Sequence, residues 1–273
     1  MSFNKSEAEK KINEFQSTFL ILKEDEPNKI DIKSNELFEN DTRNNMVNWL
    51  LFLCKTLNFN LQTLFRCVSI FDEFISKSRI CHLENGELTQ EKLNLITIAC
   101  LSLSTKLDEI NCNYVSFFTE KVLNLPNCKI FTVKDLTKME LTILKELNFK
   151  TLYTTSYDYM LFYIEMFKYF FNPNFHLFNH LKNSAENIME QNINTNNFLN
   201  MSQSDYAFSC LNHAFIQIGM GNIMNQIRNI IMIFNINNLM KKKKSLNVSN
   251  ADNENDDNLH HNLEVNLLSL RSF

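Results

Sequence analysis

Apolar residues recur along most of the chain at the three- to four-residue spacing that is typical of amphipathic helices. A first helix is predicted over residues 5–23, with its apolar positions at Ile12, Phe15, Phe19 and Leu22. Residues 24–41 are charged, rich in Asn and contain Pro27, which indicates an extended linker. The pattern therefore predicts an N-terminal helix that a polar connection separates from the rest of the chain.

Five helices are predicted between residues 42 and 149, over about 42–56, 61–76, 90–107, 114–123 and 132–147. The helix over 90–107 has an apolar centre without a polar face, so we expect other helices to surround it. The apolar faces of the first, second and last helices are Met46, Leu50 and Leu53; Leu64, Val68, Phe71 and Ile75; and Leu136, Met139, Ile143 and Leu147. Polar residues that can cap helix starts are Asp41 or Thr42, Asn60, Thr89 and Thr132.

The second half repeats this pattern less clearly, with helices predicted over residues 155–171, 175–192, 204–218 and 222–240. Residues 241–273 are polar, and we expect them to be disordered. The predicted fold class is all-α, with two tandem five-helix domains preceded by an N-terminal helix. The expected segments are 1–41 (helix and linker), 42–150 (first domain), 151–240 (second domain) and 241–273 (tail).

Composition then excludes several classes of function. The chain has only three Gly in 273 residues, whereas a dinucleotide fingerprint or a P-loop needs several Gly close together. The net charge is −4, and the only dense basic run is Lys241–Lys244, so we expect no nucleic-acid partner. No run of 18 apolar residues exists, which argues against a membrane span. The basic run is interpreted either as a nuclear-import signal or as a solvated charge cluster.

No pattern in the chain indicates catalysis or metal binding. The seven Cys form no C-x-x-C pair and the six His form no H-x-x-x-H pair, so we expect no metal and no cofactor. Four of the Cys fall within apolar helical patterns and are predicted to be buried, reduced thiols: Cys54, Cys67, Cys100 and Cys210. Asp108 and Glu109 are adjacent, so on a helix they point about 100° apart and not at one substrate. We expect neither an enzyme nor a small-molecule ligand.

Four stretches, in this order, resemble the cyclin box. Arg43 precedes Trp49 by six residues in the first, and Asp72 precedes the aromatic end of the second. The third, residues 99–109, reads ACLSLSTKLDE, and the fourth, residues 139–149, reads MELTILKELNF. The chain is thus similar to the cyclin family, and most similar to its A- and B-type cell-cycle members. A weaker second box is indicated by residues 185–188 and 204–207.

The resemblance implies a regulatory subunit that binds and activates a cyclin-dependent serine/threonine kinase in cell-cycle control, in the nucleus and cytoplasm. By position in the motifs, the kinase-binding residues are Lys106, Leu107, Glu140, Leu144 and Phe149. Arg43 and Asp72 are expected to form a structural ion pair, on the assumption that they are the only opposite charges in the apolar stretches of the first two helices. The alternatives are a transcription-type cyclin and a cyclin-like scaffold with weakened kinase or substrate binding.

The first helix departs from the family where A- and B-type cyclins carry a substrate-docking patch, Met-Arg-Ala-Ile-Leu. The same stretch here reads Thr42-Arg43-Asn44-Asn45-Met46. Met46 and Trp49 remain as candidate substrate-docking residues, but an amide replaces the apolar side chain at Asn45. We therefore expect weak docking of Arg-x-Leu substrates. The N-terminal helix is expected to pack against the first box.

Overall fold

The computed structural model describes residues 5–27, 40–77, 89–109, 118–122, 124–125 and 131–232. Every regular element within these ranges is helical, as the sequence predicted. The chain divides by its internal contacts into two compact units. The first unit comprises residues 25–159 and 186–207, and the second comprises 1–24, 160–185 and 208–273. The domain boundaries expected from the sequence, at residues 42, 151 and 241, stay predictions.

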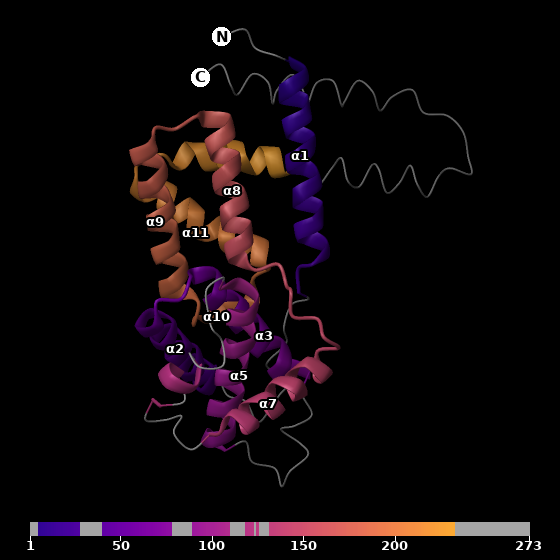
Figure 1. Ribbon diagram of the computed structural model, residues 1–273. Helices are drawn as coiled ribbons and strands as arrows, with labels where there is room; N and C mark the ends of the chain where they lie inside the picture. Colours follow the sequence, from indigo (N-terminus) through magenta and orange to yellow (C-terminus); the bar gives the residue numbers. More distant parts are fainter. Residues whose placement is uncertain are drawn as a thin grey trace, which may run out of the picture. The chain divides into compact units, whose positions relative to one another are not determined.

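The first unit is built around one helix. Its elements are α2 (Asn40–Leu57), α3 (Leu61–Lys77), α5 (Gln90–Asp108), the π-helical turn η2 (Phe118–Val122), α7 (Val133–Glu146) and α10 (Asn196–Asn200). Helix α5 packs against α2, α3 and α7 (Figure 1). Residues 96–105 of α5 are all buried, which is why this segment carries no polar face.

Capping residues set most of the helix starts. The Thr89 hydroxyl accepts the Lys92 N–H at 3.3 Å, and Thr132 and Asp135 form a capping box at the start of α7. Helix α2 begins at Asn40, earlier than the predicted caps Asp41 and Thr42, and so places Asp41 in the positively polarised first turn. Of the helix predicted for about 114–123, only residues 118–122 are described as helical; residues 114–117 and 123 lie outside the described ranges.

The start of α3 is held by a carboxylate from the end of α5. Glu109 accepts hydrogen bonds from the Asn60 backbone N–H (2.8 Å), the Asn60 side-chain amide (2.9 Å) and the Thr63 hydroxyl (2.7 Å). An acidic group at a helix N-terminus satisfies donors that the helix itself leaves unpaired. Glu109 therefore fixes the junction between α3 and α5.

We expect Glu109→Ala to lower the free energy of unfolding by about 1–2 kcal/mol, because the N-terminal donors of α3 lose their acceptor. Urea denaturation followed by circular dichroism measures the change. Glu146→Ala, at an exposed position of α7, is the control and should change the stability little. Equal stability of both variants would contradict the capping role.

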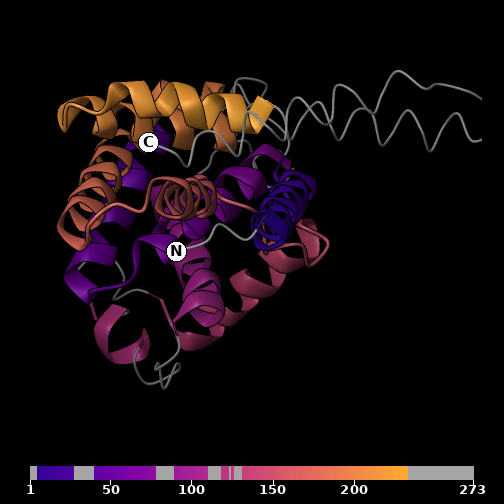
Figure 2. The same cartoon turned by 90° about the horizontal axis from the view of Figure 1, so that it is seen from above.

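The second unit contains α1 (Lys5–Glu24), most of α8 (Ser156–Phe171), the first part of α9 (Phe175–Asn192), most of α11 (Gln203–Gln217) and a helical segment over residues 221–232. These bounds agree closely with the prediction, although α10 was not predicted, and residues 233–240 of the last predicted helix lie outside the described ranges. Figure 2 shows α8 nearly end-on, with α1 beside it.

Helix α1 packs against α8. The rings of Phe15 and Phe19 have their centroids 6.0 and 5.9 Å from that of Phe162, and Phe15 also contacts Tyr169 edge-on at 5.6 Å. These contacts all lie within the second unit, so the expectation that this helix packs against the first box stays a prediction. The apolar spacing identified which face of α1 is buried, but its partner depends on an aromatic cluster more than 130 residues later in the chain.

Candidate functional site

The centre of the candidate site is an ion pair between the end of α5 and the middle of α7. The ammonium of Lys106 lies 2.6 and 2.7 Å from the two carboxylate oxygens of Glu140. The Ser102 hydroxyl donates a further hydrogen bond to the same carboxylate. The Glu140 side chain is 9% exposed, whereas that of Lys106 is 40% exposed. A buried carboxylate thus fixes the position of an ammonium that stays at the surface.

Large apolar side chains lie near this pair in the sequence, on α5, on α7 and after α7. Leu107 follows Lys106 and is 42% exposed, and Phe149, after the end of α7, is 65% exposed. Leu144 is half-buried. Sequence reasoning missed two further exposed residues, Leu141 at 46% and Leu152 at 61%. For Leu141 the signal was a leucine at polar-face spacing next to Glu140, whereas Leu152 lies outside any helix, where no helical spacing could indicate it. Exposed aliphatic and aromatic groups beside a fixed charge are typical of protein-binding surfaces.

A second ion pair anchors the α5 terminus that carries Lys106. The Arg66 Nε lies 2.9 and 2.7 Å from the two oxygens of Asp108, and Arg66 also donates to the Tyr153 carbonyl at 3.2 Å. Burial raises the pKa of Asp108, and hydrogen bonding to Arg66 opposes the rise. Asp108 and Glu109 thus each have a structural partner of their own.

Arg43 and Asp72 are joined by two hydrogen bonds of 2.8 Å between the guanidinium and the carboxylate. Their side chains are 0% and 1% exposed. The guanidinium carbon also lies 5.5 Å from the ring centroid of Phe198 in α10. The pair joins α2 to α3 inside the first unit. The assumption that these are the only charges in the apolar stretches was wrong, because α3 also buries Arg66 and Glu73.

The candidate substrate-docking residues, Met46 and Trp49, contribute little surface. Met46 is only 6% exposed, and the Gln90 side-chain amide lies 3.8 Å from its sulfur. Trp49 is half-buried and Asn45 is exposed. Trp49 therefore offers more surface to a peptide than Met46 does, and the Asn45 amide lies four residues before it, one helical turn away.

The four cysteines predicted to be buried, Cys54, Cys67, Cys100 and Cys210, are buried and free. Burial raises the pKa of Cys54 to about 12, so its thiol stays protonated. The other three cysteines lie outside the described residues.

Among the described residues, no three His, Cys, Asp or Glu side chains form a group able to hold a metal ion. In the same part of the chain, no helix is long and apolar enough to cross a membrane.

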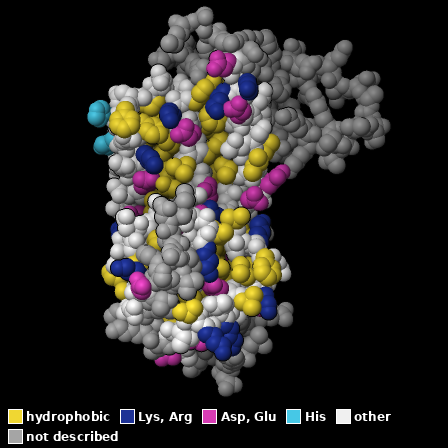
Figure 3. Space-filling view, viewed as in Figure 1, with side chains coloured by type: hydrophobic (Ala, Val, Ile, Leu, Met, Phe, Trp, Pro, Cys, Tyr) yellow, Lys and Arg dark blue, Asp and Glu magenta, His cyan; other side chains and the backbone are white. Residues whose placement is uncertain are grey.

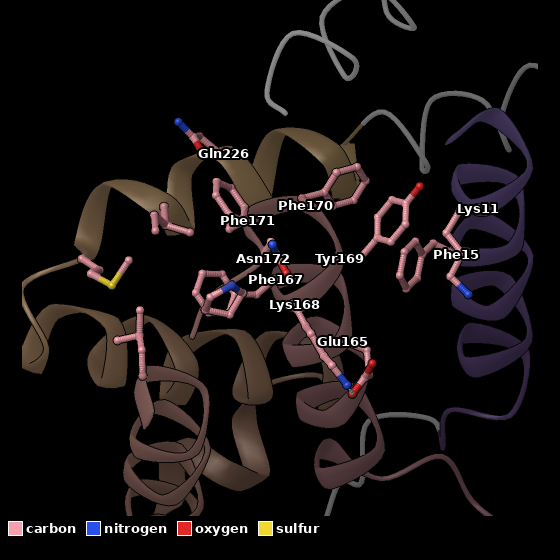
Figure 4. A pocket seen from close by; sticks show the side chains of 14 residues that line it. Lys11, Phe15, Glu165, Phe167, Lys168, Tyr169, Phe170, Phe171, Asn172 and Gln226 are labelled. Carbon is pink, nitrogen blue, oxygen red and sulfur yellow. Dashed lines mark ion pairs between the residues drawn. The ribbon is translucent and has the colours of Figure 1, made fainter. Parts of the chain in front are cut away.

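The second unit also contains an aromatic cavity of about 1120 Å³ that sequence reasoning did not identify. Figure 4 shows Phe15 of α1 together with Phe167, Tyr169 and Phe170 of α8 along its wall. Its cations are already paired, Lys11 with Glu14 and Lys168 with Glu165, so none is arranged for acid–base chemistry.

On the face drawn in Figure 3, apolar side chains form small groups separated by charged ones.

Comparisons with known proteins agree with this architecture. The family described as "Cyclin, N-terminal domain" matches residues 15–152. Cyclin-D1-1 of Arabidopsis thaliana is 27% identical over 169 residues, which is 62% of this chain and 46% of that protein. Cyclin-SDS of the same plant is 29% identical over 124 residues, 45% of this chain and 20% of that protein. The chain thus matches less than half the length of these relatives.

Among solved structures, a viral cyclin from herpesvirus saimiri has the same fold, with a TM-score of 0.60 at 18% identity, over 82% of this chain and 94% of the viral one. An all-helical chain with the cyclin-box motifs in order, and a family match over half its length, belongs to the cyclin family. The particular similarity to A- and B-type members stays a prediction.

Proposed function

We propose that this cyclin binds and activates a cyclin-dependent serine/threonine kinase in cell-cycle control, and that the surface around Lys106 and Glu140 contacts the kinase. One observation carries the proposal: a half-exposed ammonium held on a buried carboxylate, with exposed apolar residues next to both in the sequence. The family relationship supports a kinase as the partner.

The geometry suits recognition of a polypeptide backbone. Because Glu140 holds the Lys106 ammonium in one place, little side-chain entropy is lost when the ammonium donates to a carbonyl of the partner. The exposed side chains of Leu107 and Phe149 supply apolar area that can be buried on binding. The polar pair then orients the partner, and the apolar residues provide most of the affinity.

Activation results from preferential binding to one kinase conformation. A protein kinase is active only when a lysine of its β3 strand pairs with a glutamate of its αC helix. If the free kinase mostly holds αC away from this position, a protein that binds only the paired arrangement shifts the equilibrium towards activity. Moving the population from 1:99 to 99:1 requires about 10⁴-fold preference for the active state. In this mechanism the chain contributes docking and no catalytic group.

The test mixes the purified full chain with a separately purified cyclin-dependent kinase catalytic subunit. We expect a stable complex by size-exclusion chromatography and increased phosphate transfer to a serine-containing peptide. A complex without increased activity would favour the alternative of a scaffold. No complex with any of a panel of such kinases would contradict the proposal. A transcription-type cyclin would activate the kinase but prefer other substrates.

We expect a fluorescent Arg-x-Leu peptide to bind the wild-type chain weakly, because the leucine would desolvate the Asn45 amide. Asn45→Ile is expected to raise the affinity about tenfold, as measured by fluorescence anisotropy. Thr56→Ile, at an exposed position eleven residues further along the same helix, is the control and should leave the affinity unchanged. Tight binding by the wild-type chain would contradict this prediction.

A further inference from the structure

The turn that ends α7 has an unusual backbone. Leu147, the C-cap that follows the helix, is buried, and the next two residues, Asn148 and Phe149, both have left-handed conformations with φ of +50° and +59°. The N–H of Asn148 donates to the Lys145 carbonyl at 3.1 Å, and that of Phe149 donates to the Leu144 carbonyl at 2.7 Å. These two bonds form a Schellman cap, which satisfies the carbonyls at the end of the helix.

The two left-handed residues differ in how well their side chains suit this backbone. Asn adopts the left-handed region readily and is common at such caps, whereas a phenylalanine there is strained. The Phe149 side chain is also 65% exposed, so it adds little to the stability of the folded chain. Backbone strain at an exposed aromatic residue is typical of positions that serve a partner rather than the fold.

We propose that the cap of α7 is a preformed display that points Phe149 at the partner, and that Asn148 is its positioning residue. This inference rests on the proposed function, because the partner is the kinase that binds beside Lys106 and Glu140. The cap ties the backbone of Phe149 to Leu144, which lies one helical turn after Glu140. The buried side chain of Leu147 fixes the base of the turn in the core. Phe149 therefore needs no rearrangement before binding.

The proposal requires stability and binding to change in opposite directions. Replacing Phe149 by Asn relieves the strain and removes little buried area, so the melting temperature of the free chain should rise by about 2–4 °C. The same change removes an exposed aromatic contact, so the affinity for the kinase should fall at least about tenfold. A residue with only a structural role would lower both quantities or neither.

The experiment uses the full chain and a purified cyclin-dependent kinase catalytic subunit. Melting temperature is measured by calorimetry, and binding by surface plasmon resonance at a temperature where every variant is folded. The matched control is Leu152→Asn, which removes a similarly exposed apolar side chain at a residue outside the left-handed region and should not raise the melting temperature. Asn148→Gly keeps access to the left-handed backbone and should retain the affinity. Asn148→Val opposes this backbone and should weaken binding at least about tenfold.

Two outcomes overturn the proposal: a melting temperature that does not rise with Phe149→Asn, or full kinase affinity in either Phe149→Asn or Asn148→Val. Lys106→Ala with Glu140→Ala is measured in parallel to separate this inference from the proposed function. If the double variant loses kinase binding while Phe149→Asn and Asn148→Val retain it, the role proposed for the α7 cap is wrong and the proposed function stands. If the double variant retains full affinity, the proposed function fails first.

Discussion

Replacing Arg43 by leucine is expected to lower the free energy of unfolding by about 3–5 kcal/mol. The change leaves the carboxylate of Asp72, which is 1% exposed, without its two hydrogen bonds to the guanidinium. A buried charge without a partner costs much more than the net contribution of the intact pair. Urea denaturation at pH 7, followed by circular dichroism, measures the loss.

Two further variants test this explanation. Arg43→Leu combined with Asp72→Leu removes both charges and should recover much of the stability, because a well-packed apolar pair replaces a buried ionic one at little cost. Lys168→Ala removes one member of an exposed ion pair whose charged atoms are 3.7 Å apart, and should cost less than about 1 kcal/mol. If Arg43→Leu cost no more than Lys168→Ala, the pair would not be the structural element that its burial indicates.

Changing Lys106 and Glu140 to alanine together is expected to weaken kinase binding at least about 30-fold and to abolish activation. Both charges are removed at once, so no unpaired carboxylate remains buried in α7, and within the described part of the chain the Ser102 hydroxyl loses its Glu140 acceptor. The fold should survive this change, while the oriented ammonium is lost. Surface plasmon resonance and a phosphate-transfer assay measure the two effects.

The first unit offers a closely matched control on α3. Glu73 and Lys77 form a pair at 2.7 Å, with a carboxylate 6% exposed and an ammonium 51% exposed. Their burial therefore resembles that of the Lys106–Glu140 pair, at 9% and 40%. Glu73→Ala with Lys77→Ala should leave kinase binding unchanged. Equal loss in both double variants would mean that destabilisation, and not a lost contact, explains the result.

Much of the fold could be predicted from local patterns. The apolar spacing placed α3 and α8 to within about two residues, and the apolar centre of α5 correctly indicated a helix that other helices surround. Thr89 and Thr132 act as caps because a hydroxyl needs only a backbone N–H three residues later. The helix α10 was missed because its five residues are too few to show a helical period.

The candidate site was less predictable. The resemblance to cyclins pointed to Lys106, Glu140 and Phe149, but not to the burial of the Glu140 carboxylate below Ser102 and Lys106. The supporting pair of Arg66 and Asp108 was also missed, because its members lie 42 residues apart and neither belongs to a local charge pattern. Such contacts form only once α3, α5 and α7 have packed together.

The sequence by itself therefore determined the helices, most of their caps, the buried faces and the family. Each of these depends on residues within three or four positions of one another, or on motifs in a recognisable order. Only the tertiary structure decided that α1 packs on α8, that Glu109 holds the start of α3 and that Phe149 stands exposed on a left-handed turn. These features depend on which distant segments meet, because burial and partner choice are properties of the packed chain.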